Sequence, residues 1–504
     1  MLTLEQYRNK LLGCWLGKNI GGTLGAPFEW YRQFNDVTFY AQDLHGEPLP
    51  NDDLDIQLLW LIAMEERGLG LTSHTLAEYW MLYVTPHWAE YGNAKIHMRA
   101  GLVPPLCGML NNDFKDSCGA FIRSEIWAAI CPGAPALAAQ HAYRDAVIDH
   151  GDGEGVYAAV FAAALESAAF VESDIRKLLA VGLSYIPEDC GVAEAVRCAV
   201  HCRDEGMSWQ DTRDRILTDY RGECFFGRLD HISQRDQERG FAHGQRGWDA
   251  PSNMAILVVG LLWGEGDFGR SLCTTVNCGE DTDCTAATLG AIFGIIHGID
   301  GIPARWKEPI GRGIKTACLN LGELGIYGGQ LPQSIDELSD RVLRLALQMH
   351  LRHGLPLVTD LCGDEPTTYP LYAGDFRYAL YRYLGCPEYV FDFFKVYVDY
   401  GHGPGVRAEE PKVIKLHVEN TYKVQEMLQV RWHVPEGWSV TPAAHGTVFV
   451  PQQAVEDHTR TLVFTLETGV IQQGIIRSVV EFTVQGRPGV MMVPVVLLHD
   501  SLTI

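Results

Sequence analysis

Glycine recurs at every fourth position in two stretches of the chain that otherwise have a helical pattern. These glycines are Gly13, Gly17, Gly21 and Gly25 near the amino terminus, and Gly290, Gly294 and Gly298 later in the chain. A glycine inside a helix costs about 1 kcal/mol relative to alanine, so repeated use predicts that another backbone approaches closely there. A membrane dimer motif is the alternative, but the flanking acids and the short apolar length favour close packing inside a folded domain.

The first two thirds of the chain have a helical pattern. A length of 504 residues exceeds what one hydrophobic core usually organises, which predicts two or three domains. Apolar residues recur at three- and four-residue intervals over residues 1–354, and the last clear helix is expected from Ile335 to His353. Residues 355–404 are aromatic-rich and interrupted by glycine and proline, which predicts a connecting segment that packs on its neighbours.

The last hundred residues change to an alternation of apolar and polar side chains. The alternation covers residues 413–418, 428–434, 461–466 and 479–484. Turn signals such as Pro435-Glu-Gly437 separate these stretches, as expected between half-buried strands. The sequence therefore predicts a small antiparallel β-sandwich as an accessory domain over residues 405–504.

The charge balance excludes several classes of partner. The formal net charge is −23, from 63 acidic and 40 basic residues, and the basic residues form no patch. Such a chain repels polyphosphates and anionic lipid surfaces, so neither nucleic acid nor membrane is an expected partner. The apolar runs at 156–170 and 254–263 are too short, or carry Glu166, and are interpreted as buried helices.

The cysteine pattern and the amino terminus predict a cytoplasmic protein. The fourteen cysteines form no CxxC pair and show no regular spacing, which indicates reduced thiols. The first ten residues lack the basic and apolar regions of an export signal.

Two acidic clusters stand immediately before strongly apolar helical stretches. Asp52 and Asp53 precede residues 54–64, and Asp281 and Asp283 precede residues 285–296. A single aspartate at a helix start is usually an N-cap, but here each start offers two carboxylates. Four carboxylates brought together would need a cation, and oxygen ligands favour Mg²⁺ or Mn²⁺ over Zn²⁺.

Ordered motifs over residues 5–310 resemble the ADP-ribosylglycohydrolases, a family related to dinitrogenase reductase-activating glycohydrolase and the J-crystallins. The matching segments are Gly13-Cys-Trp-Leu-Gly17, Gly25-Ala-Pro-Phe-Glu29, Asn51-Asp-Asp-Leu-Asp55, Gly119-Ala-Phe-Ile-Arg123, His150-Gly-Asp-Gly-Glu-Gly-Val-Tyr157, Pro251-Ser-Asn253, Gly279-Glu-Asp-Thr-Asp-Cys284 and Ile302-Pro-Ala-Arg-Trp306. The resemblance implies an all-α helical bundle as the catalytic domain. It also implies a metal-dependent glycohydrolase that cleaves an N- or O-glycosidic bond to ribose.

By position, the resemblance implies a dinuclear centre with two Mg²⁺ ions, or Mn²⁺ in their place. The implied ligands are Asn51, Asp52, Asp53, Asp281, Asp283 and Cys284. The sequence departs from the family's pattern at Asn51, which replaces a hydroxyl, and at Leu54, which replaces a threonine. The soft sulfur of Cys284 suits Mg²⁺ poorly, so its backbone or Thr285 is the alternative ligand there.

Further residues are candidates for the chemistry and for substrate binding. The catalytic candidates are Glu29, Asp53 and Asp281, and the substrate-binding candidates are Gly119, Arg123, His150, Gly151, Gly153, Tyr157 and Trp248. Glu29 would position or protonate a reacting group, with a surface acid at a helix end as the alternative. Trp248 can stack on a base or a sugar, although burial in the core explains it equally well. His243 is a weaker candidate for the same cleft.

Two further interpretations remain at this stage. Cys198, His201 and Cys202 have a helical spacing that suits Zn²⁺, but no second ligand pair accompanies them, so a core role is favoured. The expected substrate is an ADP-ribosylated target or a small ribosylated metabolite, and a homo-oligomer is compatible with the sequence. The alternative function is a noncatalytic, crystallin-like binder of a ribosyl or nucleotide ligand.

Overall fold

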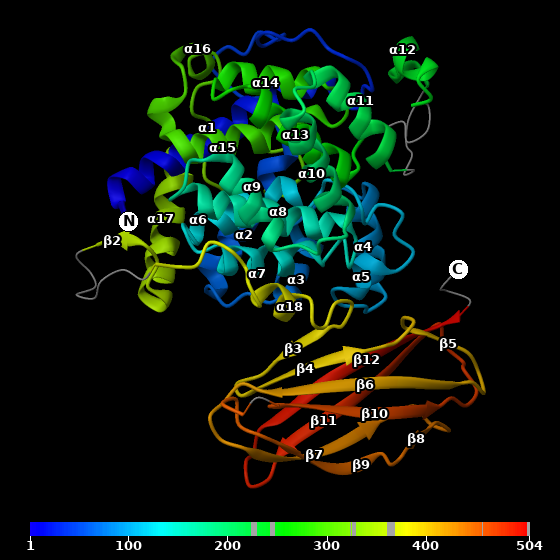
Figure 1. The fold of residues 1–504 in the computed structure, drawn as a ribbon. Helices are drawn as coiled ribbons and strands as arrows, with labels where there is room; N and C mark the ends of the chain where they lie inside the picture. The colour runs from blue at the N-terminus through cyan, green and yellow to red at the C-terminus, as the bar shows by residue number, and fades with distance from the viewer. Residues whose placement is uncertain are drawn as a thin grey trace.

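The computed structural model describes most of the chain, in two parts that differ in secondary structure (Figure 1). The described residues are 1–222, 229–241, 247–322, 324, 329–359, 368–455 and 457–500. Helices make up the first part, and strands dominate from residue 388 onward.

The helical part is an all-α domain, as predicted. Its helices are α1 (Leu4–Gly25), α2 (Asp52–Arg67), α3 (Ser73–Tyr83), α4 (Ala89–Arg99), α5 (Leu106–Met109), α6 (Glu125–Ile130), α7 (Pro135–Ala146), α8 (Glu154–Ala169), α9 (Ile175–Ser184), α10 (Gly191–Asp204), α11 (Trp209–Tyr220), α12 (Gln234–Glu238), α13 (Ala250–Trp263), α14 (Phe268–Asn277), α15 (Thr282–Gly301), α16 (Ala304–Lys307) and α17 (Ile335–His353). A two-residue parallel pairing of β1 (Leu2–Thr3) with β2 (Leu357–Val358) ties the two ends of this domain together.

The two glycine stripes pack against each other along α1 and α15. A Cβ atom at Gly17 would overlap the carbonyl oxygen of Gly290, and one at Gly13 would overlap that of Gly294. The predicted close approach of backbones is therefore confirmed, and each stripe is the partner of the other. This pair forms the buried centre of the domain, since α1 is buried almost continuously from Leu11 to Gly25.

Among the described helices, α15 alone is long and apolar enough to cross a membrane by length and composition. Of its most apolar window, 72% is buried inside the protein. Since its glycines pack on α1 and its first turn carries Asp283, α15 has the environment of a core helix.

The carboxy-terminal part is a β-sandwich of two five-stranded sheets. The first sheet has the order β3 (Glu388–Val390), β4 (Phe394–Asp399), β6 (Pro411–Asn420), β10 (Thr459–Glu467) and β8 (Ser439–Thr441). The second has the order β5 (Gly405–Val406), β12 (Val490–His499), β11 (Ile475–Val484), β7 (Glu426–His433) and β9 (His445–Val450). All neighbours are antiparallel except β5 and β12. The register pairs Phe464 with Ile414 in the first sheet and Val480 with Trp432 in the second.

Strand structure begins earlier than residue 405, the expected start of the sandwich. β3 and β4 lie within the segment expected to be a connection, yet β4 pairs with β6 and buries Phe394, Val396 and Val398. The aromatic residues around these strands obscure their alternation in the sequence. The short helix α18 (Phe376–Leu380) precedes them.

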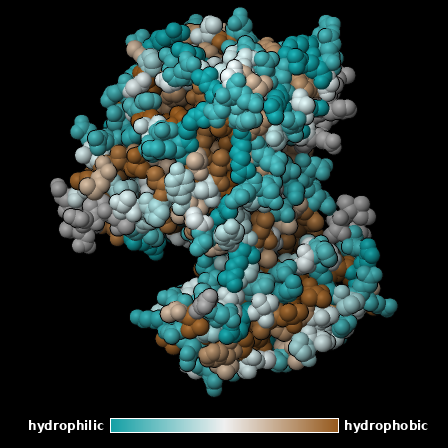
Figure 2. All heavy atoms as spheres, viewed as in Figure 1, coloured by the Kyte–Doolittle hydropathy of each residue, from teal (hydrophilic) through white to brown (hydrophobic). Residues whose placement is uncertain are grey.

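The helical domain and the sandwich share a hydrophobic contact. Leu102, Leu106 and Cys107, which lie between α4 and α5 or on α5, belong to the hydrophobic core of the sandwich. Figure 2 shows the two parts joined at a narrow junction with an open hollow beside it. The candidate site lies elsewhere, within the helical domain.

Candidate active site

The end of α1 positions the starts of both α2 and α15. The Asn51 side chain caps α2, because its Oδ1 accepts a hydrogen bond from the Asp53 backbone N–H at 2.8 Å. That side chain lies against Gly22, where a Cβ would overlap it. At α15, the Thr282 hydroxyl donates to the carbonyl oxygen of Gly25 at 2.9 Å. The two acidic helix starts are thus fastened to one turn of α1.

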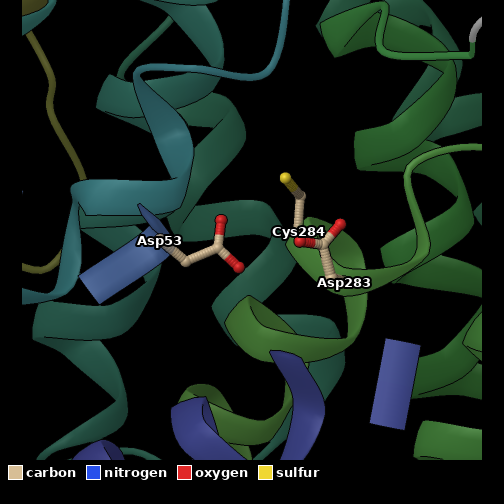
Figure 3. A group of neighbouring side chains, drawn as sticks. All are labelled: Asp53, Asp283 and Cys284. Carbon is tan, nitrogen blue, oxygen red and sulfur yellow. The ribbon is translucent and has the colours of Figure 1, made fainter. Parts of the chain in front are cut away.

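This arrangement brings the two predicted acidic motifs together. The ligand atoms of Asp53, Asp283 and Cys284 all lie within 4.8 Å of one another, and so do those of Glu29, Asp281 and Asp283. Figure 3 shows Asp53 directed from α2 across a gap towards Asp283 and Cys284. Asp283 belongs to both groups, so the cluster is continuous.

Several oxygens of the cluster are buried without a hydrogen-bond partner. Within the described part of the chain, neither carboxylate oxygen of Asp53 accepts a hydrogen bond of normal geometry, and the Oδ1 atoms of Asp281 and Asp283 are in the same situation. Asp53 is fully buried and the other two are nearly so. Unpaired buried carboxylates are costly, so this donor set fits divalent cations that prefer oxygen.

The electrostatics of the cluster show its excess of negative charge. Burial raises the pKa of Asp281 to about 7. Burial, and then the charge of Asp281, raises the pKa of Asp283 well above its usual value. At Asp53, burial raises the carboxyl pKa and the Lys18 ammonium lowers it only in part. Neutralisation by a cation would relieve the same repulsion.

Glu29 belongs to the cluster and not to the outer surface. The turn after it is fixed, since the Trp30 N–H donates to the Glu280 carbonyl at 3.0 Å. A fully buried ion pair between Arg32 Nε and Glu280 Oε1, at 2.7 Å, holds the same turn. Burial, followed by repulsion from Asp283, raises the pKa of Glu29 well above its usual value.

A cavity of about 710 Å³ opens onto the acidic cluster. Its walls include Trp30, Trp88, Tyr91, Phe114 and Trp248, and its acidic side includes Glu29, Asp52 and Asp281. The Trp248 ring lies 6.4 Å from that of Trp30 and 5.9 Å from that of Phe114, measured between centroids. The volume lies within the range of about 300–1,000 Å³ that small-molecule sites have.

Asn253 joins the Trp248 segment to the cluster. Its Oδ1 accepts a hydrogen bond from the Asp281 N–H at 3.2 Å, and its Nδ2 donates to the Asp249 carbonyl at 3.0 Å. The aromatic wall and the carboxylates therefore keep a fixed relative position.

A comparison with protein families identifies the family of the domain that contains this cavity. The model of the ADP-ribosylglycohydrolase family matches residues 3–348. The chain belongs to the ADP-ribosylglycohydrolase family. The match ends within α17, so the β-sandwich lies outside it. A search of curated proteins found no match to the chain.

Two predicted substrate contacts lie beneath the cavity wall. Arg123 is fully buried and pairs with Asp145 through Nε at 2.9 Å and with Asp149 through Nη2 at 2.6 Å. His150 is fully buried as well, with Nδ1 2.9 Å from the Lys115 carbonyl oxygen. Gly119 does line the cavity. The polar groups of Arg123 and His150 thus support the wall from behind, and their substrate contacts stay a prediction.

The remaining predicted contacts of the glycine-rich loop are not among the residues that line the cavity. Gly151 has a positive φ of 59°, and a Cβ there would overlap Met109. A Cβ at Gly153 would come too close to the Lys115 carbonyl. The Tyr157 ring packs on Tyr381 of the segment before the sandwich, with 5.5 Å between centroids. These three residues have packing roles in this structure, and their substrate contacts stay a prediction.

Glu90 is a cavity residue that the sequence did not indicate. It lines the cavity from α4, and burial raises its pKa to about 8. Its carboxylate lies within 4.8 Å of the ligand atoms of Asp149 and His150. The sequence around an isolated acid on a mostly polar helix does not indicate that the acid lines a cavity.

Two residues considered as oxygen ligands, Thr285 and Asn51, have defined hydrogen bonds. The Thr285 hydroxyl donates a hydrogen bond to the Asp281 carbonyl oxygen at 2.8 Å. The hydroxyl proton is therefore already engaged. The Asn51 amide oxygen already accepts the capping hydrogen bond and has one lone pair left for a cation.

The alternative zinc site on α10 is not formed. Cys198 and Cys202 are buried, whereas the His201 side chain is exposed and lies 3.2 Å from Glu205. Within the described ranges these three residues form no ligand cluster, and the favoured core role holds for the two cysteines but not for His201. His243 lies outside the described residues.

Proposed function

We propose that the chain is a metal-dependent glycohydrolase that cleaves an N- or O-glycosidic bond to ribose. The substrate would be an ADP-ribosyl adduct or a related small ribosylated metabolite. Membership of the ADP-ribosylglycohydrolase family supports glycohydrolase activity on ADP-ribosyl compounds. The observation that carries the metal dependence is Asp53, fully buried with two unpartnered oxygens facing Asp283.

The carboxylates would hold two Mg²⁺ ions, or Mn²⁺. The proposed oxygen ligands are Asn51, Asp52, Asp53, Asp281 and Asp283. When bound, such ions supply positive charge that orients ribose hydroxyls and a water molecule and stabilises charge near the anomeric carbon.

The chain's own side chains would place the substrate. Glu29 stands at the edge of the cavity beside Asp281 and Asp283, where its carboxyl group can position or protonate a group at the anomeric carbon. Trp248 and Trp30 offer aromatic faces to a base or a sugar. A cavity of about 710 Å³ suits a small ligand or the tip of a modified side chain.

The same proposal places the protein in the cytoplasm with a small ribosylated ligand or an ADP-ribosylated target as its partner. All twelve cysteines in the described ranges are free, which suits a reducing compartment. The net charge of −23 argues against nucleic acid as a partner.

A hydrolysis screen tests the function. The purified chain is stripped with EDTA and supplied with Mg²⁺, Mn²⁺ or neither, and then offered ADP-ribosyl-arginine, ADP-ribosyl-serine and simple ribosides. We expect release of ADP-ribose or ribose only when a metal is present, and the active substrate identifies the leaving group. Tight Mg²⁺ binding without release from any of these compounds would contradict the proposal and favour a crystallin-like binder.

A further inference from the structure

Cys284 places a sulfur atom inside a centre otherwise built from oxygen. The residue lies in the first turn of α15, directly after Asp283, and is buried with an exposed fraction of 8%. Its Sγ lies within 4.8 Å of carboxylate oxygens from both Asp53 and Asp283 (Figure 3). Asp53 comes from α2, so two separate helices contribute to this group.

The geometry of this group suits a single cation. A Zn–S bond of about 2.3 Å and a Zn–O bond of about 2.1 Å place two ligands of a tetrahedral ion about 3.6 Å apart. The ligand atoms of the group lie within 4.8 Å of one another, so a small inward movement of the side chains brings them around one ion. Both oxygens of Asp53 and one oxygen of Asp283 are buried without a hydrogen-bond partner in the described part of the chain.

A second thiol borders the same cavity. Cys118 precedes the short 3₁₀ helix Phe121–Arg123 and is buried, with both Cys118 and Cys284 lining the cavity wall. Hard cations such as Mg²⁺ gain little from sulfur, whereas Zn²⁺ and Co²⁺ bind thiolates well. A sulfur at this position therefore offers a ligand that thiophilic cations use and Mg²⁺ does not.

We propose that Cys284 gives this centre a thiophilic mode, in which Zn²⁺ or Co²⁺ binds through Asp53, Asp283 and the Cys284 sulfur in competition with Mg²⁺. The inference rests on the metal centre of the proposed function but not on its hydrolytic activity. Binding releases the thiol proton to water and leaves a thiolate on the cation.

A cobalt titration tests the sulfur ligand without any substrate. The full-length chain, stripped with EDTA, is titrated with Co²⁺ alone while absorption in the near ultraviolet is recorded. We expect a thiolate-to-cobalt charge-transfer band in the wild type and its loss in C284T. The matched control is C273S, which removes a half-buried thiol on α14 outside the cavity and should keep the band. Cobalt binding without the band in the wild type, or a band that survives in C284T, would overturn the proposal.

Affinities give a second measurement. In competition with a chromophoric chelator, C284T should bind Zn²⁺ about 10–100-fold more weakly, while Mg²⁺ affinity by calorimetry stays nearly constant. An equal loss for both cations contradicts a sulfur-specific role. Near-ultraviolet circular dichroism verifies the fold of C284T, and C284S replaces it if that variant does not fold. A wild type with the band but without hydrolysis refutes the proposed function alone, and hydrolysis without the band refutes this inference alone.

Discussion

Lys18 and Glu125 form a fully buried ion pair, with 2.7 Å between Nζ and Oε1, on the protein side of the acidic cluster. Lys18 also donates to the Ile122 carbonyl at 2.6 Å, and the Glu125 carboxylate accepts a hydrogen bond from Gln57 at 2.8 Å. Although burial alone would lower the pKa of Lys18, Glu125 and then Asp53 raise it above its usual value. The lysine is therefore a permanent internal cation beside carboxylates that otherwise repel one another.

Replacing this cation should destabilise the fold strongly. In K18M, Glu125 stays buried without its partner, and breaking a buried pair typically costs about 3–5 kcal/mol. Guanidinium unfolding monitored by circular dichroism measures the loss. The double variant K18M/E125Q should recover part of it, because the orphaned charge is gone.

The control for this pair is K177M. Lys177 pairs with Glu172 at 3.2 Å on the surface, with 61% of the lysine side chain exposed. Its loss should hardly change the unfolding midpoint, since exposed pairs contribute little. If K18M were as harmless as K177M, Lys18 would not carry the charge balance of the core.

The packing of α1 on α15 predicts a steric effect at Gly17. In G17A the new methyl group meets the Gly290 carbonyl, and neither backbone has space to retreat. We expect a loss of about 3 kcal/mol, at the upper end of ordinary overpacking, in the free energy of unfolding. G70A is the matched control, because a Cβ at Gly70 meets nothing within 4 Å. Equal stabilities of the two variants would contradict the close contact.

Local patterns in the sequence predicted much of the fold. α17 runs from Ile335 to His353 as expected, because its apolar period is regular and Gly354 ends it with a left-handed φ of 69°. The acidic motifs stand at the starts of α2 and α15, where the apolar runs placed them. That the two glycine stripes face each other depends on tertiary packing, so the sequence predicted a close approach without naming the partner.

The environment of the site depended on contacts distant in the sequence. Arg123 looks like a substrate-binding arginine in its motif, yet Asp145 and Asp149 enclose it from a different helix end. Glu90 reaches the cavity through the packing of α4, which no local signal reveals. Tyr157 depends on Tyr381, more than two hundred residues away, for its position.

Stability should fall in mild acid because of His141. Burial, followed by the charge of Arg144, lowers the pKa of His141 to about 3, and its ring stacks on Trp127 with centroids 5.4 Å apart. In the unfolded chain a histidine takes up a proton near pH 6.5. Below that pH the unfolded state binds the extra proton and the folded state does not, so folding stability decreases as pH falls from about 6.5 towards 3.

Carboxylates also titrate in this pH range, so the contribution of His141 is measured as the difference in folding stability between H141Q and the wild type. Urea unfolding at pH 7 and pH 5 should show a smaller acid-induced loss for H141Q, by up to about 1.4 kcal/mol per pH unit below 6.5. H45Q changes an exposed histidine and should follow the wild type. A pH dependence in H141Q identical to that of the wild type would show that His141 does not resist protonation.

The cluster predicts opposite effects of D283N on activity and on the metal-free fold. Turnover should fall about a thousandfold or more, because metal ions supply several kcal/mol of transition-state stabilisation. Without metal, D283N should unfold at an equal or higher temperature than the wild type, since it removes one of the carboxylates that repel each other.

Added Mg²⁺ separates these two effects in a thermal melt. It should raise the melting temperature of the wild type and leave D283N nearly unchanged. D300N, at an exposed position on the same helix, should behave like the wild type in turnover and in the melt. A D283N protein that keeps full activity and a Mg²⁺-dependent melting temperature would exclude Asp283 from the centre.

Trp248 should act on substrate binding more than on the chemical step. Its ring forms a wall of the cavity between Trp30 and Phe114, and Asn253 fixes its segment relative to Asp281. Stacking on a base contributes about 1–3 kcal/mol, so W248A should raise KM about 10–100-fold with a smaller change in kcat. W248F keeps an aromatic face and should show a smaller rise in KM. If W248A instead lowered kcat with KM unchanged, the indole would serve the positioning of the carboxylates, and the base or sugar would have to bind along another wall of the cavity.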